Sequence, residues 1–233
     1  MILPSDTGND DVYPIRRAPA GLVVTADGNA PAWRTAAAVP LRFFHRQSSD
    51  HRPRTLVRLL YDNTALLLRF TVEDQYIRSV HTRFMDPVCT DSCVEFFVQP
   101  RPNAGYINFE INAGGTLLAS RVMDPRRTAG GSLADARPLT PEEAASIEIA
   151  STLPAIVEPE IVEPTTWSVC ARIPISIFLS DEAGARPAPG VEWRGNFYKC
   201  GDHTSHPHWA SWRPIGDALN FHCPEYFGRL RFE

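Results

Sequence analysis

Proline and glycine recur throughout this sequence and restrict the chain to short elements. The 233 residues include 21 prolines and 14 glycines, with no internal repeat. Proline ends helices and cannot donate a ladder hydrogen bond, and glycine favours turns. The apolar segments between these turn signals have the length of strands. The pattern predicts an all-β fold, an antiparallel β-sandwich of two sheets with about ten strands and one or two short helices.

The strands are expected at the apolar segments. The clearest hairpin covers 55–74 and turns at Asp62-Asn63. Further strands are predicted at 21–28, 39–45, 92–99, 105–112, 115–122, 146–153, 167–173, 192–202 and 228–233. The segment 139–146 begins like a helix, because Thr140 suits the N-cap and Pro141 the first helical position.

The remaining segments set the predicted domain boundaries. Residues 1–20 are polar and proline-rich, and they are predicted to form an irregular N-terminal arm. Residues 21–233 show no sharp break in composition, so a single domain is predicted there. The Pro/Glu-rich segment 154–165 is the best linker candidate, although a hairpin loop with an edge strand is the favoured interpretation.

Charge, targeting signals and cysteine usage narrow the function. A net charge of −4 without a basic, aromatic-rich run argues against a nucleic-acid partner. No apolar stretch is long enough to span a membrane, and no export signal is visible, so the cytoplasm is the default location. Five cysteines without a CxxC pair favour free buried thiols in a reducing compartment.

The segments 92–99 and 105–112 place a polar face on the predicted sandwich. Side chains alternate between the two faces of a strand. In the second segment, Ile107, Phe109 and Ile111 share one side, which suits the core. The other side carries Tyr106, Asn108, Glu110 and Asn112.

A hairpin between these segments brings two carboxylates together. In the expected register Glu95 lies opposite Glu110. Like charges opposite each other destabilise a sheet, so the pair must share a proton, bind a cation or be bridged by an arginine. Arg69 and Arg172, in neighbouring predicted strands, are candidates for that bridge. Such a face is either an internal Arg–Glu network or a platform for a polyhydroxy ligand.

Residues 198–215 concentrate metal-binding and aromatic side chains. Cys200, His203, His206 and His208 permit a metal site, but their spacing matches no known zinc signature, so a loop packed by aromatic rings is favoured. Trp209 and Trp212 are more informative, because an indole face can stack on a sugar ring. Core packing is the alternative for either tryptophan.

Several short motifs follow one another in a recognisable order. They are ADGNAPAW, DSCVEFFVQP, YINFEINAGGTLL, KCGD, PHWASWRPI and NFHCPEYFGRLRF. This order resembles the carbohydrate-binding module family 9-like proteins. The resemblance implies a β-sandwich that binds sugars without cleaving them and often accompanies xylanases or related hydrolases, frequently as an exported protein. It also implies two tryptophans that clamp the end of a glucan or xylan chain, with structural calcium nearby.

The resemblance is partial at the family's binding site. The glutamate of the family's D-S-V-E pattern resembles Glu95, and its late-loop tryptophan resembles Trp212. Val88 lies in the segment where the other clamp tryptophan is expected, and Glu110 stands where the family has an arginine. The side chains that would replace the missing stacking surface are Phe84 and Trp209.

These observations predict a non-catalytic carbohydrate-binding domain. The predicted ligand-binding residues are Trp212, Trp209, Glu95, Glu110, Asn108, Asn112, Tyr106, Arg69 and Arg172. The expected partners are an oligosaccharide or polysaccharide and a separately encoded glycoside hydrolase, and calcium is expected only from the resemblance. The alternatives are a glycoside hydrolase that uses acidic residues, a haem protein using Met85 or Met123 with a histidine, and a structural module without a ligand.

Overall fold

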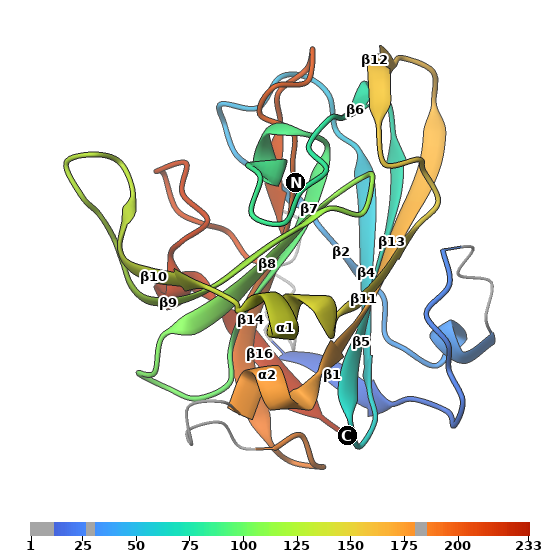
Figure 1. The fold of residues 1–233 in the computed structure, drawn as a ribbon, viewed down its shortest axis with the longest axis vertical. Helices are drawn as coiled ribbons and strands as arrows, with labels where there is room; N and C mark the ends of the chain where they lie inside the picture. Colours follow the sequence, from blue (N-terminus) through green and yellow to red (C-terminus); the bar gives the residue numbers. More distant parts are fainter. Residues whose placement is uncertain (1–11, 27–30, 180–185) are drawn as a thin grey trace, which may run out of the picture.

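Sixteen strands and two short helices make up the computed structural model, which describes residues 12–26, 31–179 and 186–233 (Figure 1). The strands form two layers that meet at β1 (Val12–Arg17). β1 pairs in parallel with β16 (Gly228–Phe232) of the first layer and with β4 (Arg54–Tyr61) of the second. The other pairs among the described strands are antiparallel, so the predicted β-sandwich is confirmed, with a main sheet that is mixed.

The first layer carries the candidate site. From one edge to the other it consists of β10 (Leu133–Pro138), β9 (Leu117–Arg127), β8 (Tyr106–Asn112), β7 (Cys93–Gln99), β14 (Glu192–Cys200), β16 and β1. The second layer consists of β1, β4, β5 (Ala65–Asp74), β13 (Thr165–Pro174) and β11 (Glu148–Ser151). The minor strands are β2 (Val39–Pro40), β3 (Phe43–Phe44), β6 (Ile77–Ser79), β12 (Val157–Ile161) and β15 (Trp209–Ser211).

The hydrophobic core fills the space between the two layers. Val94, Phe96 and Val98 of β7 are all buried in this core, whereas Glu95 and Phe97, which lie between them, point to the other face. Phe109 and Phe197 extend it along β8 and β14. Alternation along each strand therefore gives the first layer one apolar inner face and leaves its other face free for polar side chains.

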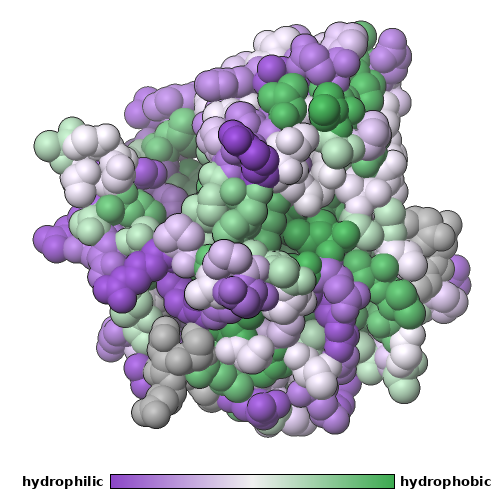
Figure 2. Space-filling view, viewed as in Figure 1, coloured by the Kyte–Doolittle hydropathy of each residue, from purple (hydrophilic) through white to green (hydrophobic). Residues whose placement is uncertain are grey.

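Two short helices cover the open side of the sandwich. α1 (Pro141–Ala145) and α2 (Ile175–Leu179) lie in front of the space between the layers (Figure 1). Ile177 and Phe178 of α2 are buried in the core, and apolar side chains gather in the middle of this face (Figure 2). None of the described helices is long and apolar enough to cross a membrane.

The predicted hairpins and helix start are confirmed. Glu95 lies opposite Glu110 in the β7–β8 pair. In the β4–β5 turn, the Asp62 carboxylate accepts hydrogen bonds from the backbone N–H groups of the residues two and three positions later. At α1 the Thr140 hydroxyl accepts from the backbone N–H of Glu143, and the Glu143 carboxylate accepts from the backbone N–H of Thr140.

Other local predictions differ from the structure. Residues 12–17, assigned to an irregular arm, form β1, because Tyr13 and Ile15 are buried in the core; residues 1–11 lie outside the described part. The strand predicted at 21–28 is absent from residues 21–26. Leu22 and Val24 pack there as a loop against a small apolar cluster. β10 was not predicted, and it forms a long hairpin with β9.

The segment 154–165 behaves as an edge rather than a linker. It contains β12, which pairs only with β6 in a separate two-stranded sheet. This agrees with the favoured interpretation of the sequence, a loop with an edge strand.

Candidate functional site

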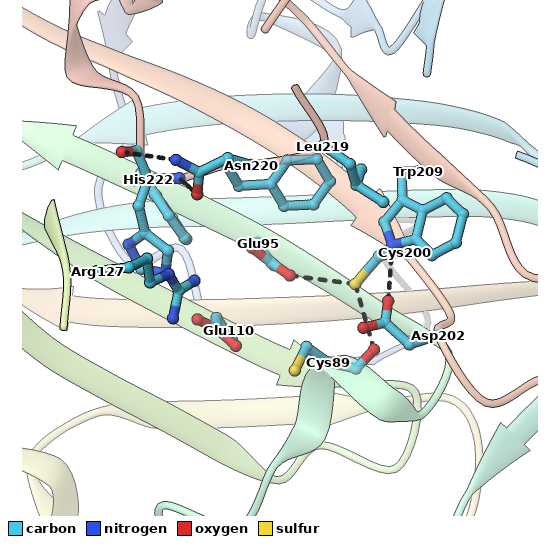
Figure 3. Close-up of a pocket in the computed structure, with 12 residues that line it drawn as sticks. Cys89, Glu95, Glu110, Arg127, Cys200, Asp202, Trp209, Leu219, Asn220 and His222 are labelled. Carbon is cyan, nitrogen blue, oxygen red and sulfur yellow. Dashed lines mark hydrogen bonds between the residues drawn. The ribbon is translucent and has the colours of Figure 1, made fainter. Parts of the chain in front are cut away.

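A pocket of about 240 Å³ lies on the outer face of the first layer, away from the core (Figure 3). Strands β7, β8 and β14 supply its floor, and residues that follow β14 and β15 supply much of its wall. The residues that line it are Cys89, Glu95, Phe97, Glu110, Arg127, Cys200, Asp202, Trp209, Leu219, Asn220, Phe221 and His222. They come from six segments that are distant in sequence, so the pocket exists only in the folded chain.

The two predicted carboxylates form the centre of the floor. Glu95 and Glu110 are directly opposite each other and almost fully buried. Burial and the neighbouring Glu110 raise the pKa of Glu95 well above its usual value. Burial also raises the pKa of Glu110 to about 7, although the Asn108 amide donates a 2.8 Å hydrogen bond to its carboxylate. Neither carboxylate has a salt-bridge partner among the described residues, so the predicted arginine bridge is absent there.

Sulfur atoms adjoin the carboxylates. Cys200 of β14 lies opposite Cys93 of β7, and its thiol donates to Glu95 Oε1 at 3.1 Å. A hydrogen bond with Cys93, followed by burial, raises the pKa of the Cys200 thiol well above its usual value. Cys89 adds a third thiol from the short turn before β7, where burial raises its pKa. All five cysteines are free thiols, as the odd number and the spacing indicated.

Trp209 and Asp202 form one wall of the pocket. Trp209 pairs with Cys200 across the β14–β15 ladder, so its side chain lies on the same outer face. The indole N–H donates a 2.7 Å hydrogen bond to Asp202 Oδ1 (Figure 3). Burial raises the pKa of Asp202. This bond holds a partly exposed aromatic ring in a fixed orientation at the pocket.

His222 and its neighbours form the opposite wall. The Tyr106 hydroxyl and His222 Nδ1 are 2.7 Å apart, and burial lowers the pKa of His222 to about 4. Phe221 stacks on Tyr198 with ring centroids 4.1 Å apart. Arg127, at the exposed end of β9, lies on the Glu110 side of the pocket (Figure 3).

The structure brings together some of the nine predicted site residues. Glu95, Glu110 and Trp209 line the pocket, and Asn108 and Tyr106 contact lining residues. Asn112 lies on the same face, but its side chain is bonded to Asp91 and to the turn after β8.

Trp212 does not lie beside Glu95. Its backbone N–H donates to the carbonyl of Phe197, and its ring packs on Phe197 and Tyr13 in the core. Phe197 points to the inner face, whereas Tyr198, the residue opposite Glu95, points to the outer face. The sheet therefore separates the Trp212 ring from the two carboxylates.

The two predicted arginines belong to the other layer. Arg69 lies on β5 opposite Cys170 of β13. Arg172 on β13 binds Asp62 at 2.8 Å and the Thr64 hydroxyl at 2.6 Å. It therefore stabilises the β4–β5 turn and does not approach Glu95 or Glu110.

The residues proposed for metal or haem binding are dispersed. His206 stacks on Tyr76, His208 is buried against Lys199, and Cys200 lies on the outer face of the same sheet. His203 is exposed. Met123 is half exposed on β9, outside the pocket.

The sequence interpretation missed most of the pocket wall. Arg127 was missed because β9 extends five residues beyond its predicted end at 122. Asn220, Phe221 and His222 lie in a segment without regular structure, and nothing local in the sequence places it over β7 and β8. The motif KCGD contains two of these wall and floor residues, Cys200 and Asp202. The sequence pattern predicted Cys200 only as a buried thiol or a metal ligand, and not as part of this pocket.

Neither cluster of convergent metal-ligating side chains in the described part suits calcium. Calcium takes six to eight oxygen ligands. The two clusters of convergent His, Cys, Asp or Glu side chains in the described part are His51 with Asp74 and His208, and Cys93 with Glu95 and Cys200. Each contains nitrogen or sulfur donors, which calcium does not favour.

Comparison with known proteins places this fold among sugar-binding domains. A sequence profile described as "Carbohydrate-binding family 9" matches residues 32–232. A crystal structure of a proposed carbohydrate-binding protein from Bacteroides uniformis ATCC 8492 aligns with a TM-score of 0.82 and 27% identity, over 96% of this chain and 99% of the other.

Two structures from Caldicellulosiruptor kristjanssonii share the fold at lower identity. A carbohydrate-binding module family 9 in complex with cellotriose aligns with a TM-score of 0.64 and 14% identity, over 95% of this chain and 93% of the other. The complex with glucose gives a TM-score of 0.61 and 14% identity, over 95% and 96%. A search of curated protein sequences found no match.

Proposed function

The chain belongs to carbohydrate-binding family 9, and we propose that it binds one end of a glucan- or xylan-type oligosaccharide in the pocket above Glu95 and Glu110. The observation that carries this proposal is the convergence of a partly exposed tryptophan and three carboxyl groups in one pocket of the outer face. Sugar sites combine an apolar ring face with a few fixed polar groups.

The volume of the pocket supports a small ligand. Pockets for drug-sized molecules occupy roughly 300–1,000 Å³, and this one occupies about 240 Å³. It therefore suits one terminal sugar ring, with the rest of the chain outside. The cellotriose and glucose complexes of the Caldicellulosiruptor module make these two sugars the first ligands to test.

Stacking is assigned to Trp209. Its ring lies at the pocket wall and is held by the hydrogen bond to Asp202. A sugar ring presents C–H groups on one face, and a fixed indole offers a large apolar surface for them. Because the ring is already oriented, little side-chain entropy is lost on binding.

Sugar hydroxyls are assigned to the polar groups around Glu110. A carboxyl group with a pKa near 7 exists in both protonation states at neutral pH, so it can donate or accept a hydrogen bond. Asn220 and Arg127 add an amide and a guanidinium on the same side. This set discriminates among hydroxyl arrangements, while Trp209 contributes contact with any pyranose.

Isothermal titration with cellotriose, xylotriose and glucose tests the proposal. The variant Trp209→Ala should lower the affinity at least about tenfold, the loss expected for a hot-spot aromatic residue. Phe43→Ala is the matched control, because Phe43 is an exposed aromatic residue outside the pocket. Equal affinities for both variants would exclude this pocket as the sugar site.

A role in carbohydrate catabolism beside a separately encoded hydrolase extends this proposal. The alternative function, hydrolysis of glycosidic bonds by the acidic residues, is tested with the same sugars. Reducing-end release that disappears in Glu110→Gln would replace the binding proposal with a hydrolase. Binding without release supports a domain that delivers a partner enzyme to its substrate.

A further inference from the structure

Beneath the pocket, two cysteines and a glutamate converge from two neighbouring strands. Cys93 and Cys200 are directly opposite each other, and Glu95 lies two residues further along β7 on the same face. One ligand atom from each side chain lies within 4.8 Å of the other two. All three residues are almost fully buried, with 0%, 1% and 2% of their surface exposed.

We propose that Cys93, Cys200 and Glu95 bind a thiophilic divalent cation such as Zn²⁺. Zinc–sulfur bonds of about 2.3 Å and zinc–oxygen bonds of about 2.0–2.2 Å place tetrahedral ligands roughly 3.3–3.8 Å apart. The Cys200 Sγ–Glu95 Oε1 distance is already 3.1 Å. Small side-chain rotations on two rigid, paired strands complete this arrangement.

The two sulfur ligands and the one oxygen ligand determine which metals this site can bind. Two thiolates and one carboxylate suit zinc and its thiophilic analogues such as Cd²⁺, whereas Ca²⁺ and Mg²⁺ require oxygen ligands. We assign the fourth position to the pocket side, where the Glu110 carboxylate and the Cys89 thiol are further donors among the lining residues. Because Glu95 and Cys200 line the pocket, the ion has a route from solvent.

The electrostatics of the floor favour a cation. Glu95 and Glu110 are buried side by side without a salt bridge, and Asp202 lies in the wall above them. Facing carboxylates repel each other within a sheet. A divalent ion replaces the two thiol protons, which are released on binding, and gives the Glu95 carboxylate a positively charged partner.

Cadmium provides a direct spectroscopic test. The reduced, chelator-treated full chain is titrated with Cd²⁺ in the absence of sugar, and absorbance by thiolate-to-cadmium charge transfer is recorded with the stoichiometry from native mass spectrometry. We expect one ion per chain and a charge-transfer band. Cys93→Ser and Cys200→Ser should each reduce the band by about half and weaken binding by more than about tenfold.

Matched variants and a second measurement keep the test independent of folding. Cys170→Ser, in the other layer, and Cys223→Ser, outside the cluster, should keep the full band. In the wild-type chain, Zn²⁺ should protect Cys93 and Cys200 from alkylation, as located by peptide mass spectrometry.

Three results would overturn the proposal: no band, a full band in both serine variants, or protection confined to the other cysteines. The titration contains no carbohydrate, so its result is independent of the proposed sugar site.

Discussion

Two buried polar clusters lie on opposite faces of one strand, and they differ in charge balance. Lys199 and Cys200 are consecutive residues of β14. Lys199 points inward, and its ammonium lies 2.6 Å from His208 Nε2 and 3.4 Å from Asp74 Oδ2. Cys200 points outward to Glu95, where Arg127 is the only lysine or arginine that lines the pocket and neither glutamate forms a salt bridge among the described residues.

In the inner cluster every charge has a partner. Asp74 also binds His51 at 2.7 Å and accepts from the Trp167 indole at 3.0 Å. Burial by itself would raise the pKa of Asp74, but the Lys199 ammonium and these hydrogen bonds hold it below the usual range. The cluster joins the two layers, because Lys199 lies on β14 and Asp74 on β5.

In the outer cluster the charges remain unbalanced. Burial raises the pKa of both Glu95 and Glu110; repulsion from Glu110 adds to the effect at Glu95, and repulsion from Asp202 adds to it at Glu110. A site that is unfavourable without a partner is suited to receive hydroxyl groups or a cation. Burial alone therefore does not distinguish a polar cluster that stabilises the fold from a polar cluster that binds a ligand. The pairing of charges within the cluster does.

The largest expected effect concerns the inner cluster. Lys199→Met leaves Asp74 buried without its cation, so the free energy of unfolding should fall by about 3–5 kcal/mol in urea titrations. Arg231→Met, which removes an exposed cation from the same layer, should change it by less than about 1 kcal/mol. Equal small losses in the two variants would contradict the structural role of the inner cluster.

The next effect concerns the outer cluster. Glu110→Gln removes a carboxylate that repels Glu95, so the free energy of unfolding should stay within about 1 kcal/mol of wild type. The free energy of cellotriose binding should become about 1.5–3 kcal/mol less favourable, because the charged acceptor of a hydrogen bond from a sugar hydroxyl is lost. Glu73→Gln, at an exposed position of β5, is the control for both measurements. A large loss of stability with unchanged affinity would mean that Glu110 stabilises the fold and does not bind the sugar.

The pH dependence of the unfolding free energy tests the inner cluster through His208. Burial and the Lys199 ammonium lower the pKa of His208 from 6.5 to about 3. Between these values the unfolded state binds a proton that the folded state does not, so the contribution of His208 to stability rises with pH and is complete above about pH 6.5.

The measurement is the difference in unfolding free energy between wild type and His208→Gln. The slope of this difference should approach about 1.4 kcal/mol per pH unit within that window. His203→Gln, at an exposed position, is the matched control. A difference for His208→Gln that does not change with pH would mean that the folded state does not lower the pKa of His208.

The smallest expected effect is at the pocket rim. Arg127→Ala should weaken cellotriose binding by about 0.5–1.5 kcal/mol, the range for one hydrogen bond exposed to water. Arg126→Ala, one residue earlier on β9 and paired with Asp124, should leave the affinity unchanged. Equal affinities in both variants would remove Arg127 from the site.

The floor of the pocket could be predicted from the sequence because strand geometry is local. Alternation fixes which side chains share a face, and a short loop limits the register, so Glu95 opposite Glu110 followed directly. The same rule assigns Asn108 to that face. The sequences of two strands and the loop between them were sufficient to predict where these residues lie.

The wall could not be predicted because it depends on long-range pairing. The resemblance favoured Trp212 as the stacking residue, but the pairing of β15 with β14 places Trp209 with Cys200 on the outer face. Trp212 follows the end of β15 and turns into the core. The path of residues 219–222 over the sheet likewise depends on contacts distant in sequence.

The parallel pairing of β1 with β16 determines when the sandwich can close during folding. Its partner β16 is the last of the described strands, so β1 cannot pair with it until residue 232 has left the ribosome. β1 is also the strand through which the two layers join. The hairpins of each layer can form during synthesis, since their contacts are local. The closure of the sandwich, and with it the burial of Tyr13 and Ile15, therefore follows the synthesis of all the other described strands.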